Sequence, residues 1–418
     1  MRLWETDTHF RESVRHLPQA IRLSTVSAGL VTAVMGITGP VVLVFQAAKL
    51  AEYTPDQIGS WIFAIFAGGG LMSLLLALMY RQPATGAYSM AGSALLVQVL
   101  PQFGLHLAVG AYIMGAVLIL ALALTGWFNK LMTFLPPEIV MAMLAGVLFH
   151  FGAALFPELV GNPVVVGPTL LAFFVSHKVK RFVPPLTVAV VVAIVQTLLF
   201  YPPAAGEGIQ WALTLPHFYT PQFTLDAFLS ITLPLVLLAL SSQNATGIGV
   251  LWALGYRPRI TAITFFTGLF SLITAPMAGH GVNLATPMTA ICGDEHSHPD
   301  PQLRYGAAVV NGLLFITFGV LGITVASVME TLPTSLIVTI AALAMIPVIL
   351  TTLQQGFASG RRPLGAVFAL VIAASNVTLF GVGAAFWSLV GGTLVTLLLD
   401  PKPAVDDEAQ QAMESATE

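Results

Sequence analysis

The sequence predicts an all-α protein that crosses a membrane about 14 times, as two inverted repeats of seven segments each. Three observations predict this fold. The 418-residue chain is 56% hydrophobic and only 8% charged, whereas soluble proteins carry about 25% charged residues. Apolar runs of roughly 20 residues, the length of a membrane-spanning helix, recur along the chain. Two further runs are short, broken by glycine, and lie at matching places in the two halves.

The first half starts with a polar, basic stretch at residues 1–22, which lacks the apolar region and small-residue cleavage site of a signal peptide. The first repeat is expected at residues 23–201. Its third segment is short and interrupted by glycine, with an extended lead-in near Gly86-Ala87-Tyr88, so we interpret it as a half helix. The expected segments are 23–48, 58–80, 83–100, 105–128, 137–154, 163–175 and 186–201.

A polar, proline-rich linker without Lys or Arg, residues 202–222, separates the halves. The second repeat is expected at residues 223–400. Its tenth segment breaks at Ala278-Gly279-His280-Gly281 and restarts as a second half helix. An acidic tail, residues 401–418, is predicted to be disordered and cytosolic. The expected segments are 225–254, 260–276, 282–292, 305–328, 334–353, 364–380 and 383–399.

Seven is an odd number, so the second repeat must be inverted relative to the first. The first span of each repeat carries a Thr-Gly pair, Thr38-Gly39 and Thr246-Gly247. With the expected segments, all of the 16 Lys and Arg residues except Lys49 fall on the side of the N-terminus. Positive charge marks the cytosolic side, so both termini are predicted to be cytosolic.

The two half helices would start near the middle of the membrane. A helix N-terminus carries free N–H groups and about half a positive charge, and broken helices of this kind build substrate sites in transporters. An anionic substrate is therefore expected. The alternative is that the glycines and serines only allow close helix packing. The candidate substrate-binding residues of these segments are Tyr88, Ser89, Ala91, Gly92, Gly281, Asn283 and Thr286.

Polar residues in the eighth segment extend this candidate site. Gln243 and Asn244 lie in the middle of a span, where polar side chains are costly unless they face a cavity or a partner. They would hydrogen-bond a carboxylate or hold its coupling ion; alternatively, they would bond carbonyl groups of neighbouring helices. His280 and Asp294 are the candidate proton-coupling residues, since histidine titrates near pH 6.5; the alternatives for His280 are a neutral ring bonded to a carbonyl and a ring exposed to the outside vestibule. Glu138 fits an ordinary acidic helix start.

Other chemistry finds little support. The loop around His296-Ser297-His298 is flanked by acids, but nothing completes a metal site of known spacing, so no metal or cofactor is expected. The single cysteine, Cys292, excludes an intrachain disulfide. No nucleophile and base share one depth, which argues against an enzyme. The basic residues are spread over short loops, which argues against nucleic-acid binding.

Two stretches resemble a known family. Gln243-Asn-Ala-Thr-Gly-Ile, preceded by Leu233-Pro-Leu, resembles the eighth span of the bacterial benzoate:proton symporter family. Asn283-Leu-Ala, Thr289-Ala-Ile-Cys and His298-Pro-Asp-Pro resemble its tenth segment and the loop after it. This family is related to uracil permease-like and sulfate permease-like transporters. The resemblance implies a core domain and a gate domain, elevator-like or rocking movement, and a homodimer.

The third segment departs from the family pattern. It reads Tyr88-Ser-Met-Ala-Gly-Ser-Ala-Leu, where the family has Trp-Ser-Thr-Pro-Gly-Ala-Ala-Leu. His280 and Pro287 are also unusual in the tenth segment. We therefore expect a secondary transporter of the bacterial inner membrane that imports benzoate or a similar small aromatic carboxylate with protons. The alternative is an uncoupled uniporter, channel or exchanger of the same fold with another small organic anion or ring compound.

Overall fold

The structure is a computed structural model that describes residues 9–38, 40–126, 136–179, 185–200 and 209–400. Within these residues, eight helical stretches are long and apolar enough to cross a membrane, and four shorter apolar helices accompany them. The chain is therefore a multi-pass, mainly helical membrane protein. Lys130 and the acidic tail lie outside the described residues, and the expected number of 14 crossings stays a prediction.

The first half begins with a short amphipathic helix and continues with apolar helices. The broken third segment is present as a three-residue strand followed by a ten-residue helix. The fifth segment extends to Gly161, beyond the expected end at residue 154. The elements are α1 (Phe10–Ala20), α2 (Leu23–Thr38), α3 (Pro40–Leu50), α4 (Pro55–Tyr80), β1 (Gly86–Tyr88), α5 (Met90–Val99), η1 (Leu100–Gln102), α6 (Leu105–Thr125), α8 (Pro137–Gly161), α9 (Pro163–Val179) and α10 (Pro185–Phe200).

The second half repeats the strand-then-helix arrangement at its broken segment. Its first span contains two wide π-helical stretches, η2 and η3, that the sequence did not predict. The elements are α11 (Leu225–Ala227), η2 (Phe228–Thr232), α12 (Leu233–Leu237), η3 (Leu238–Ala245), α13 (Thr246–Ala253), α14 (Ile260–Thr274), η4 (Ala275–Met277), β2 (Val282–Leu284), α15 (Thr286–Gly293), η5 (Pro301–Leu303), α16 (Tyr305–Val320), α17 (Gly322–Thr331), α18 (Thr334–Phe357), α19 (Pro363–Ala374) and α20 (Ala384–Leu399).

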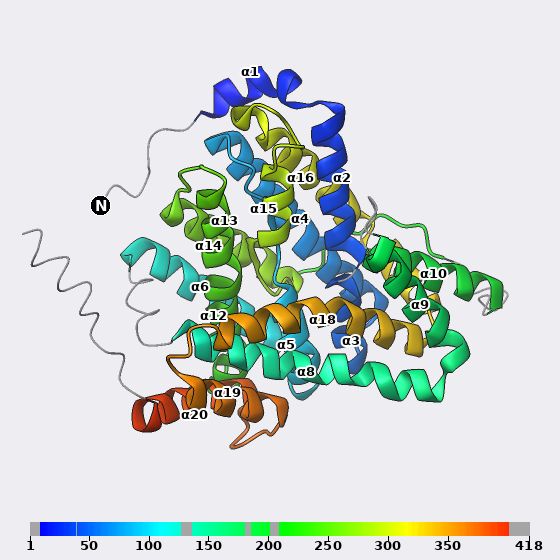
Figure 1. Ribbon diagram of the computed structural model, residues 1–418, viewed down its shortest axis with the longest axis vertical. Helices are drawn as coiled ribbons and strands as arrows, with labels where there is room; N and C mark the ends of the chain where they lie inside the picture. Colours follow the sequence, from blue (N-terminus) through cyan, green and yellow to red (C-terminus); the bar gives the residue numbers. More distant parts are fainter. Residues whose placement is uncertain (1–8, 39, 127–135, 180–184, 201–208, 401–418) are drawn as a thin grey trace, which may run out of the picture.

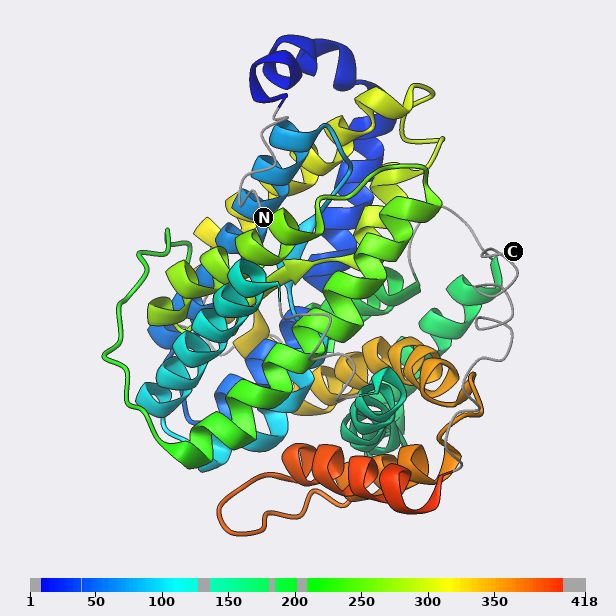
Figure 2. The same cartoon turned by 90° about the vertical axis from the view of Figure 1, so that its left-hand side faces the viewer.

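The helices form two packing groups, each drawn from both halves of the sequence. In the first group, α4 packs on α16 and α17, α6 packs on α14, and α2 packs on α16. In the second group, α8 packs on α18 and α19, and α19 packs on α20. Figure 1 shows the second group across the lower part of the molecule, below α4, α15 and α16, and Figure 2 shows the same separation from the side. In each group, helices that are far apart in the sequence therefore pack against one another.

Glycines let α4 and α16 approach backbone to backbone. A Cβ atom on Gly70 would lie 2.5 Å from the carbonyl oxygen of Gly312, and one on Gly312 would lie 2.8 Å from the oxygen of Gly70. Such small-residue contacts are typical of helix pairs in membranes, where packing replaces the hydrophobic effect between helices.

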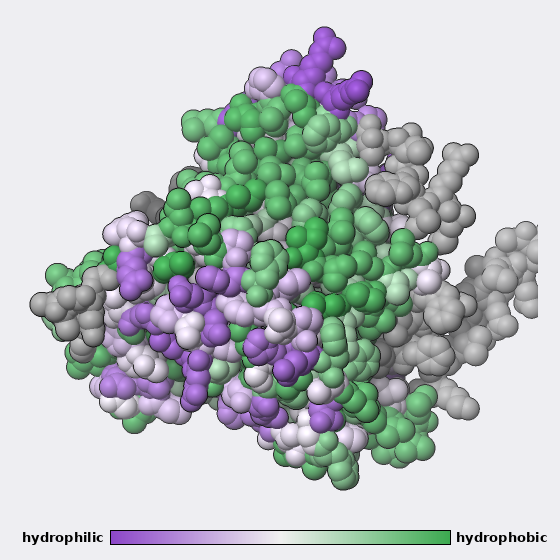
Figure 3. All heavy atoms as spheres, turned by 180° about the vertical axis from the view of Figure 1, so that it is seen from behind, coloured by the Kyte–Doolittle hydropathy of each residue, from purple (hydrophilic) through white to green (hydrophobic). Residues whose placement is uncertain are grey.

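The described part of the linker and the residues after it, 209–224, form no helix or strand and are fixed to the first group. The backbone N–H of Thr214 donates to the Val320 oxygen, that of Tyr219 to Pro276, and that of Gln222 to His106, each at 2.8 Å. The linker therefore covers the ends of α16, η4 and α6. On the face shown in Figure 3, a broad hydrophobic area covers the upper part of the surface, and hydrophilic residues gather in the lower part.

Candidate functional site

The two broken segments meet as a short antiparallel ribbon. β1 pairs with β2, with Gly86 opposite Leu284, Ala87 opposite Asn283, and Tyr88 opposite Val282. Each strand leads directly into a short helix, α5 after β1 and α15 after β2. Because the strands are antiparallel, the two helices leave the ribbon in opposite directions, and both N-termini lie beside it. The two partial positive charges of these N-termini thus act on one region.

Glycines also set the ribbon against α4. A Cβ atom on Gly86 would lie 2.7 Å from the Gly69 oxygen, and one on Gly69 would lie 2.8 Å from the Ala87 Cα. The Ser73 hydroxyl completes this contact, since it accepts from the Gly86 N–H at 2.7 Å and donates to the Gly86 oxygen at 3.1 Å. Gly281, which precedes β2, has a φ of 120°, in the region that favours glycine.

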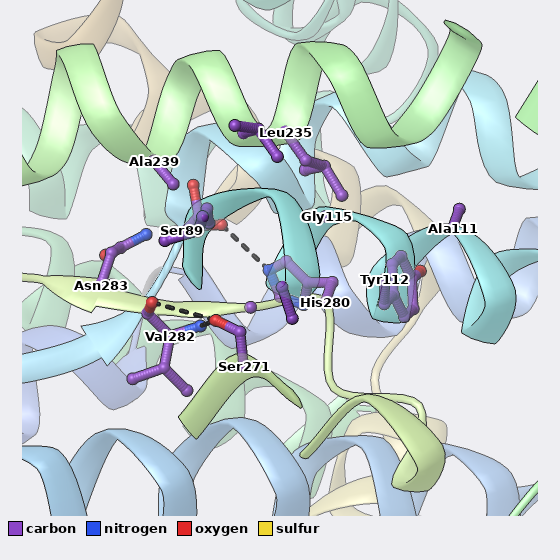
Figure 4. Close-up of a pocket in the computed structure, with 14 residues that line it drawn as sticks. Ser89, Ala111, Tyr112, Gly115, Leu235, Ala239, Ser271, His280, Val282 and Asn283 are labelled. Carbon is purple, nitrogen blue, oxygen red and sulfur yellow. Dashed lines mark hydrogen bonds between the residues drawn. The ribbon is translucent and has the colours of Figure 1, made fainter. Parts of the chain in front are cut away.

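A small cavity of about 20 Å³ lies beside the ribbon. This volume is close to that of a single water site, so the cavity is closed to a benzoate-sized ligand in this conformation. Figure 4 shows Ser89 and His280 on one side of it, with Leu235 and Ala239 on the neighbouring helix. The lining comes from α6, α12, η3, α14 and the two broken segments, and it consists of Ser89, Ala111, Tyr112, Gly115, Ala116, Ile119, Leu235, Val236, Ala239, Ser271, His280, Gly281, Val282 and Asn283.

Two polar side chains of this lining lack hydrogen-bond partners in the described part of the chain, the Tyr112 hydroxyl and the Asn283 amide, and Asn283 lacks them at both polar atoms. Asn283 is 1% exposed. Its carboxamide is directed toward Ser89 (Figure 4). A buried, unpaired amide costs about 1–3 kcal/mol. A buried amide without protein partners is available to pair with a bound ligand or a water molecule.

His280 is paired on both ring nitrogens. The indole N–H of Trp61 donates to Nδ1 at 2.9 Å, and Nε2 lies 3.1 Å from the Ser89 carbonyl oxygen and 3.0 Å from the Ser93 hydroxyl. An indole N–H only donates and a carbonyl only accepts, so we assign the neutral ring with its hydrogen on Nε2. His280 thereby joins α4, the start of α5 and the lead-in to β2.

Asn244 hydrogen-bonds the backbone of the ribbon from the first span of the second half. Its amide oxygen accepts from the Leu284 N–H at 2.9 Å, and its amide nitrogen donates to the Thr267 hydroxyl at 3.0 Å. The hydroxyl of Thr286 bonds that of Thr246 at 2.6 Å and donates to the Gln243 carbonyl oxygen at 3.3 Å. These contacts fix the start of α15 on η3 and α13. Gln243, Asn244 and Thr286 do not line the cavity.

Other predicted site residues also point elsewhere. The Tyr88 hydroxyl donates to the Gly36 oxygen of α2 at 3.1 Å, and the Tyr88 ring lies beside His280, with ring centroids 5.8 Å apart, without lining the cavity. Gly92 donates its N–H to the Ser89 hydroxyl at 2.9 Å and packs on Leu235, and Ala91 is buried without lining the cavity. Of the predicted residues, the structure thus brings Ser89, His280, Gly281 and Asn283 together.

Asp294 lies on the loop after α15, half exposed. Its carboxylate accepts from the backbone N–H of His296 at 2.8 Å and bonds the ring of the same residue at 2.5 Å. These contacts lower the pKa of Asp294, first through the backbone hydrogen bond and then through the ring, and they raise the pKa of His296. Asp294 is not part of the cavity lining.

Glu138 has a structural contact. It forms an ion pair with Arg362 at 3.0 Å and accepts from the Ser359 hydroxyl at 3.1 Å, so it links α8 to the loop before α19. No group of three His, Cys, Asp or Glu side chains that could hold a metal ion occurs among the residues described.

Sequence reasoning missed Trp61, Ser93, Tyr112 and Ser271. Ser271 accepts from the Val282 N–H at 2.9 Å and so fixes the first residue of β2. Trp61 carried a signal, because an indole N–H within an apolar span needs a buried acceptor. The small and aliphatic residues of α6 and α12 carried none, since their composition matches that of helices facing lipid.

We expect Asn244→Ala to destabilise the protein by about 1–3 kcal/mol, because it leaves the Leu284 N–H and the Thr267 hydroxyl buried without partners. Thermal melting of the purified protein in detergent measures this effect as a lower Tm. Asn162→Ala is the matched control, because Asn162 is exposed, and its Tm should stay unchanged. An equal Tm for Asn244→Ala and Asn162→Ala would contradict the stabilising role of the Asn244 hydrogen bonds.

Comparisons with known proteins show a matching family and similar proteins. The family model described as "Benzoate membrane transport protein" matches residues 19–398. The chain is 33% identical over 379 residues to the "Inner membrane protein YdcO" of Escherichia coli, covering 90% of this chain and 96% of the relative. It is 29% identical over 391 residues to the "Benzoate membrane transport protein" of Acinetobacter baylyi, covering 93% and 98%.

Solved structures share the fold at low identity. The transmembrane domain of the cyanobacterial bicarbonate transporter BicA matches with a TM-score of 0.60 at 17% identity, covering 89% of this chain and 98% of that one. The overall structure of SLC26A9 matches with a TM-score of 0.62 at 12% identity, covering 93% of this chain and 67% of that one. At these identities the likeness concerns the fold.

Proposed function

The chain belongs to the benzoate membrane transport protein family, and on this premise we propose that it imports benzoate or a similar small aromatic carboxylate together with protons. That it is a membrane transporter, and not an enzyme, follows from the family. The substrate and the coupling are the proposal. The single observation that supports the carboxylate best is Asn283, a buried amide without partners beside two helix N-termini.

The chemistry of the cavity suits an aromatic carboxylate. The two N-termini supply positive potential without a Lys or Arg, and the Asn283 amide nitrogen is able to donate to a carboxylate oxygen. Leu235, Val236 and Ile119 supply an apolar wall for the ring. Tyr112 adds an aromatic edge to this wall, at 6.4 Å between its ring centroid and that of His280. Substrate entry requires the cavity to widen, by movement of the lining helices.

We also propose the arrangement in the membrane. The repeats are residues 23–201 and 223–400, joined by the linker 202–222, with both termini in the cytosol of a bacterial cell, in its inner membrane, and with the chain in a homodimer. The antiparallel pairing of β1 and β2 supports inverted repeats, since two equivalent segments then run in opposite directions. The relative named an inner membrane protein supports the location.

A second candidate is uncoupled transport or exchange of the anion. The observation that favours it is the absence of a carboxylate from the described lining, together with the two occupied nitrogens of His280. In this case the substrate anion would cross alone or in exchange for another anion.

Uptake of labelled benzoate into proteoliposomes tests both candidates. The vesicle interior is made alkaline, with and without a protonophore, and protein-free liposomes subtract the neutral acid that crosses the bilayer unaided. Protein-dependent accumulation that the protonophore abolishes is expected for symport. A parallel assay without a gradient uses vesicles preloaded with unlabelled benzoate. Exchange without gradient-driven accumulation would support the second candidate, and no protein-dependent flux in either assay would overturn benzoate as the substrate.

A further inference from the structure

The amphipathic helix α1 docks one face on the end of the first packing group. The His9 N–H donates to the Met79 oxygen at 2.8 Å, and the Tyr305 hydroxyl donates to the Ser13 oxygen at 2.7 Å. Ala20 is fully buried, and it lies so close to Gly306 that a Cβ atom there would be 2.3 Å from the Ala20 oxygen. One side of α1 is thus held on the ends of α4 and α16.

A second face of α1 is apolar and exposed. Phe10 and Val14 are 44% and 46% exposed, and residues four apart lie on the same side of a helix. The exposed apolar surface continues into α2, where Leu23, Val26 and Leu30 have exposed side chains. Since α2 belongs to an apolar stretch long enough to span the membrane, these residues face lipid.

A third face of α1 is basic. Arg11 and Arg15 are also four apart and exposed, and Arg22 is exposed at the turn into α2. None of the three guanidinium groups forms an ion pair or hydrogen bond with the described residues. The acid of this helix, Glu12, bonds the Arg81 guanidinium at 2.6 Å and the His9 ring at 3.2 Å. The basic face is therefore left without a counter-charge in the part of the chain that is described.

The position of α1 matches a membrane surface. It lies across the end of α2, at one end of the molecule (Figures 1 and 2). Figure 3 shows a hydrophilic cap at that end, directly above the broad hydrophobic surface. Helices with this pattern lie at the boundary of acyl chains and headgroups, with apolar residues in the acyl region and arginines at the headgroups.

We propose that the outer face of α1 binds anionic phospholipid headgroups of the adjacent leaflet through Arg11, Arg15 and Arg22, with Phe10 and Val14 inserted between the acyl chains. The occupant is a lipid, because the basic face borders the lipid-facing residues of α2. An anionic headgroup supplies the missing counter-charge. This site is separate from the cavity. The proposal therefore does not depend on which substrate the protein transports.

Native mass spectrometry of the full-length protein in detergent, titrated with phosphatidylglycerol or phosphatidylcholine, tests the proposal. The unmodified protein is expected to retain phosphatidylglycerol in preference to phosphatidylcholine. The triple variant Arg11→Gln, Arg15→Gln, Arg22→Gln should bind phosphatidylglycerol about tenfold more weakly, since basic residues near a membrane surface each add to the attraction. Equal retention of both lipids by the unmodified protein would overturn the proposal, and this measurement needs no variant.

Two further variants make the result specific. Arg11→Lys, Arg15→Lys, Arg22→Lys keeps the charge and should retain most of the binding. Arg257→Gln with Arg361→Gln removes exposed arginines from other loops and should leave phosphatidylglycerol binding unchanged. If this control loses as much binding as the triple Gln variant, the attraction belongs to the overall charge and the α1 site is refuted.

Discussion

Asn283→Leu is expected to lower the affinity for benzoate about ten- to a hundredfold while leaving the Tm of the substrate-free protein unchanged or raised. A hydrogen bond to a charged group contributes about 1.5–3 kcal/mol, and about 1.4 kcal/mol corresponds to a factor of ten. Stability should not fall, because both ends of the Asn283 amide are unpaired in this conformation. Uptake kinetics in proteoliposomes and thermal melting in detergent measure the two quantities.

Asn283→Asp separates charge from shape at the same position. It keeps the size of the side chain but places a carboxylate beside the bound carboxylate, so benzoate uptake should be lost. Asn311→Leu is the matched control, since Asn311 is equally buried, donates to the Thr32 hydroxyl at 3.2 Å and lies outside the cavity. It should lose stability and keep its affinity. Unchanged benzoate affinity in both Asn283 variants would refute a role in binding.

The sequence predicted the broken segments because glycine and polar residues within apolar runs are visible without a structure. The Gly279-His280-Gly281 run and the polar Asn283 interrupt the apolar pattern, and Gly281 and Asn283 line the cavity. The pairing of the two segments as a ribbon was not predicted. Three-residue strands leave no alternating pattern, and the contact joins residues far apart in the sequence, Ala87 and Asn283 among them.

The direction of each side chain was harder to predict than its polarity. Asn244 needed partners in the membrane, as the sequence indicated, but its amide oxygen bonds the Leu284 backbone N–H rather than lining the cavity. A buried polar side chain is satisfied by hydrogen bonds either to a ligand or to backbone groups, so the sequence alone does not show which of the two it bonds. The π-helical turn η3 at this residue changes the direction of the side chains, and π turns have no simple sequence signature.

His280→Gln is expected to keep benzoate uptake within a few-fold of wild type, with the same dependence on the pH gradient. Glutamine is neutral and does not titrate, and it offers one acceptor for the Trp61 N–H and one donor for the Ser89 oxygen. His280→Ala removes both contacts and leaves a buried indole N–H unpaired, so it should reduce uptake strongly and lower the Tm. The pH profiles of the two variants in proteoliposomes measure the difference.

The same comparison decides between a structural and a proton-carrying histidine. If His280 carries the coupled proton, His280→Gln must lose benzoate accumulation driven by the pH gradient while it keeps benzoate exchange. A structural, neutral His280 predicts that the variant keeps both. Trp61→Phe gives an independent reading, because it removes the donor at Nδ1 and leaves that nitrogen free to take a proton. If His280 is a neutral ring that links Trp61 to Ser89, benzoate uptake by Trp61→Phe should show a pH dependence that the wild type lacks. An unaltered pH profile of uptake would mean that the Trp61 hydrogen bond does not set the protonation state of His280. The cavity would in either case keep its carboxylate recognition in Asn283 and the two helix N-termini, since none of these groups titrates.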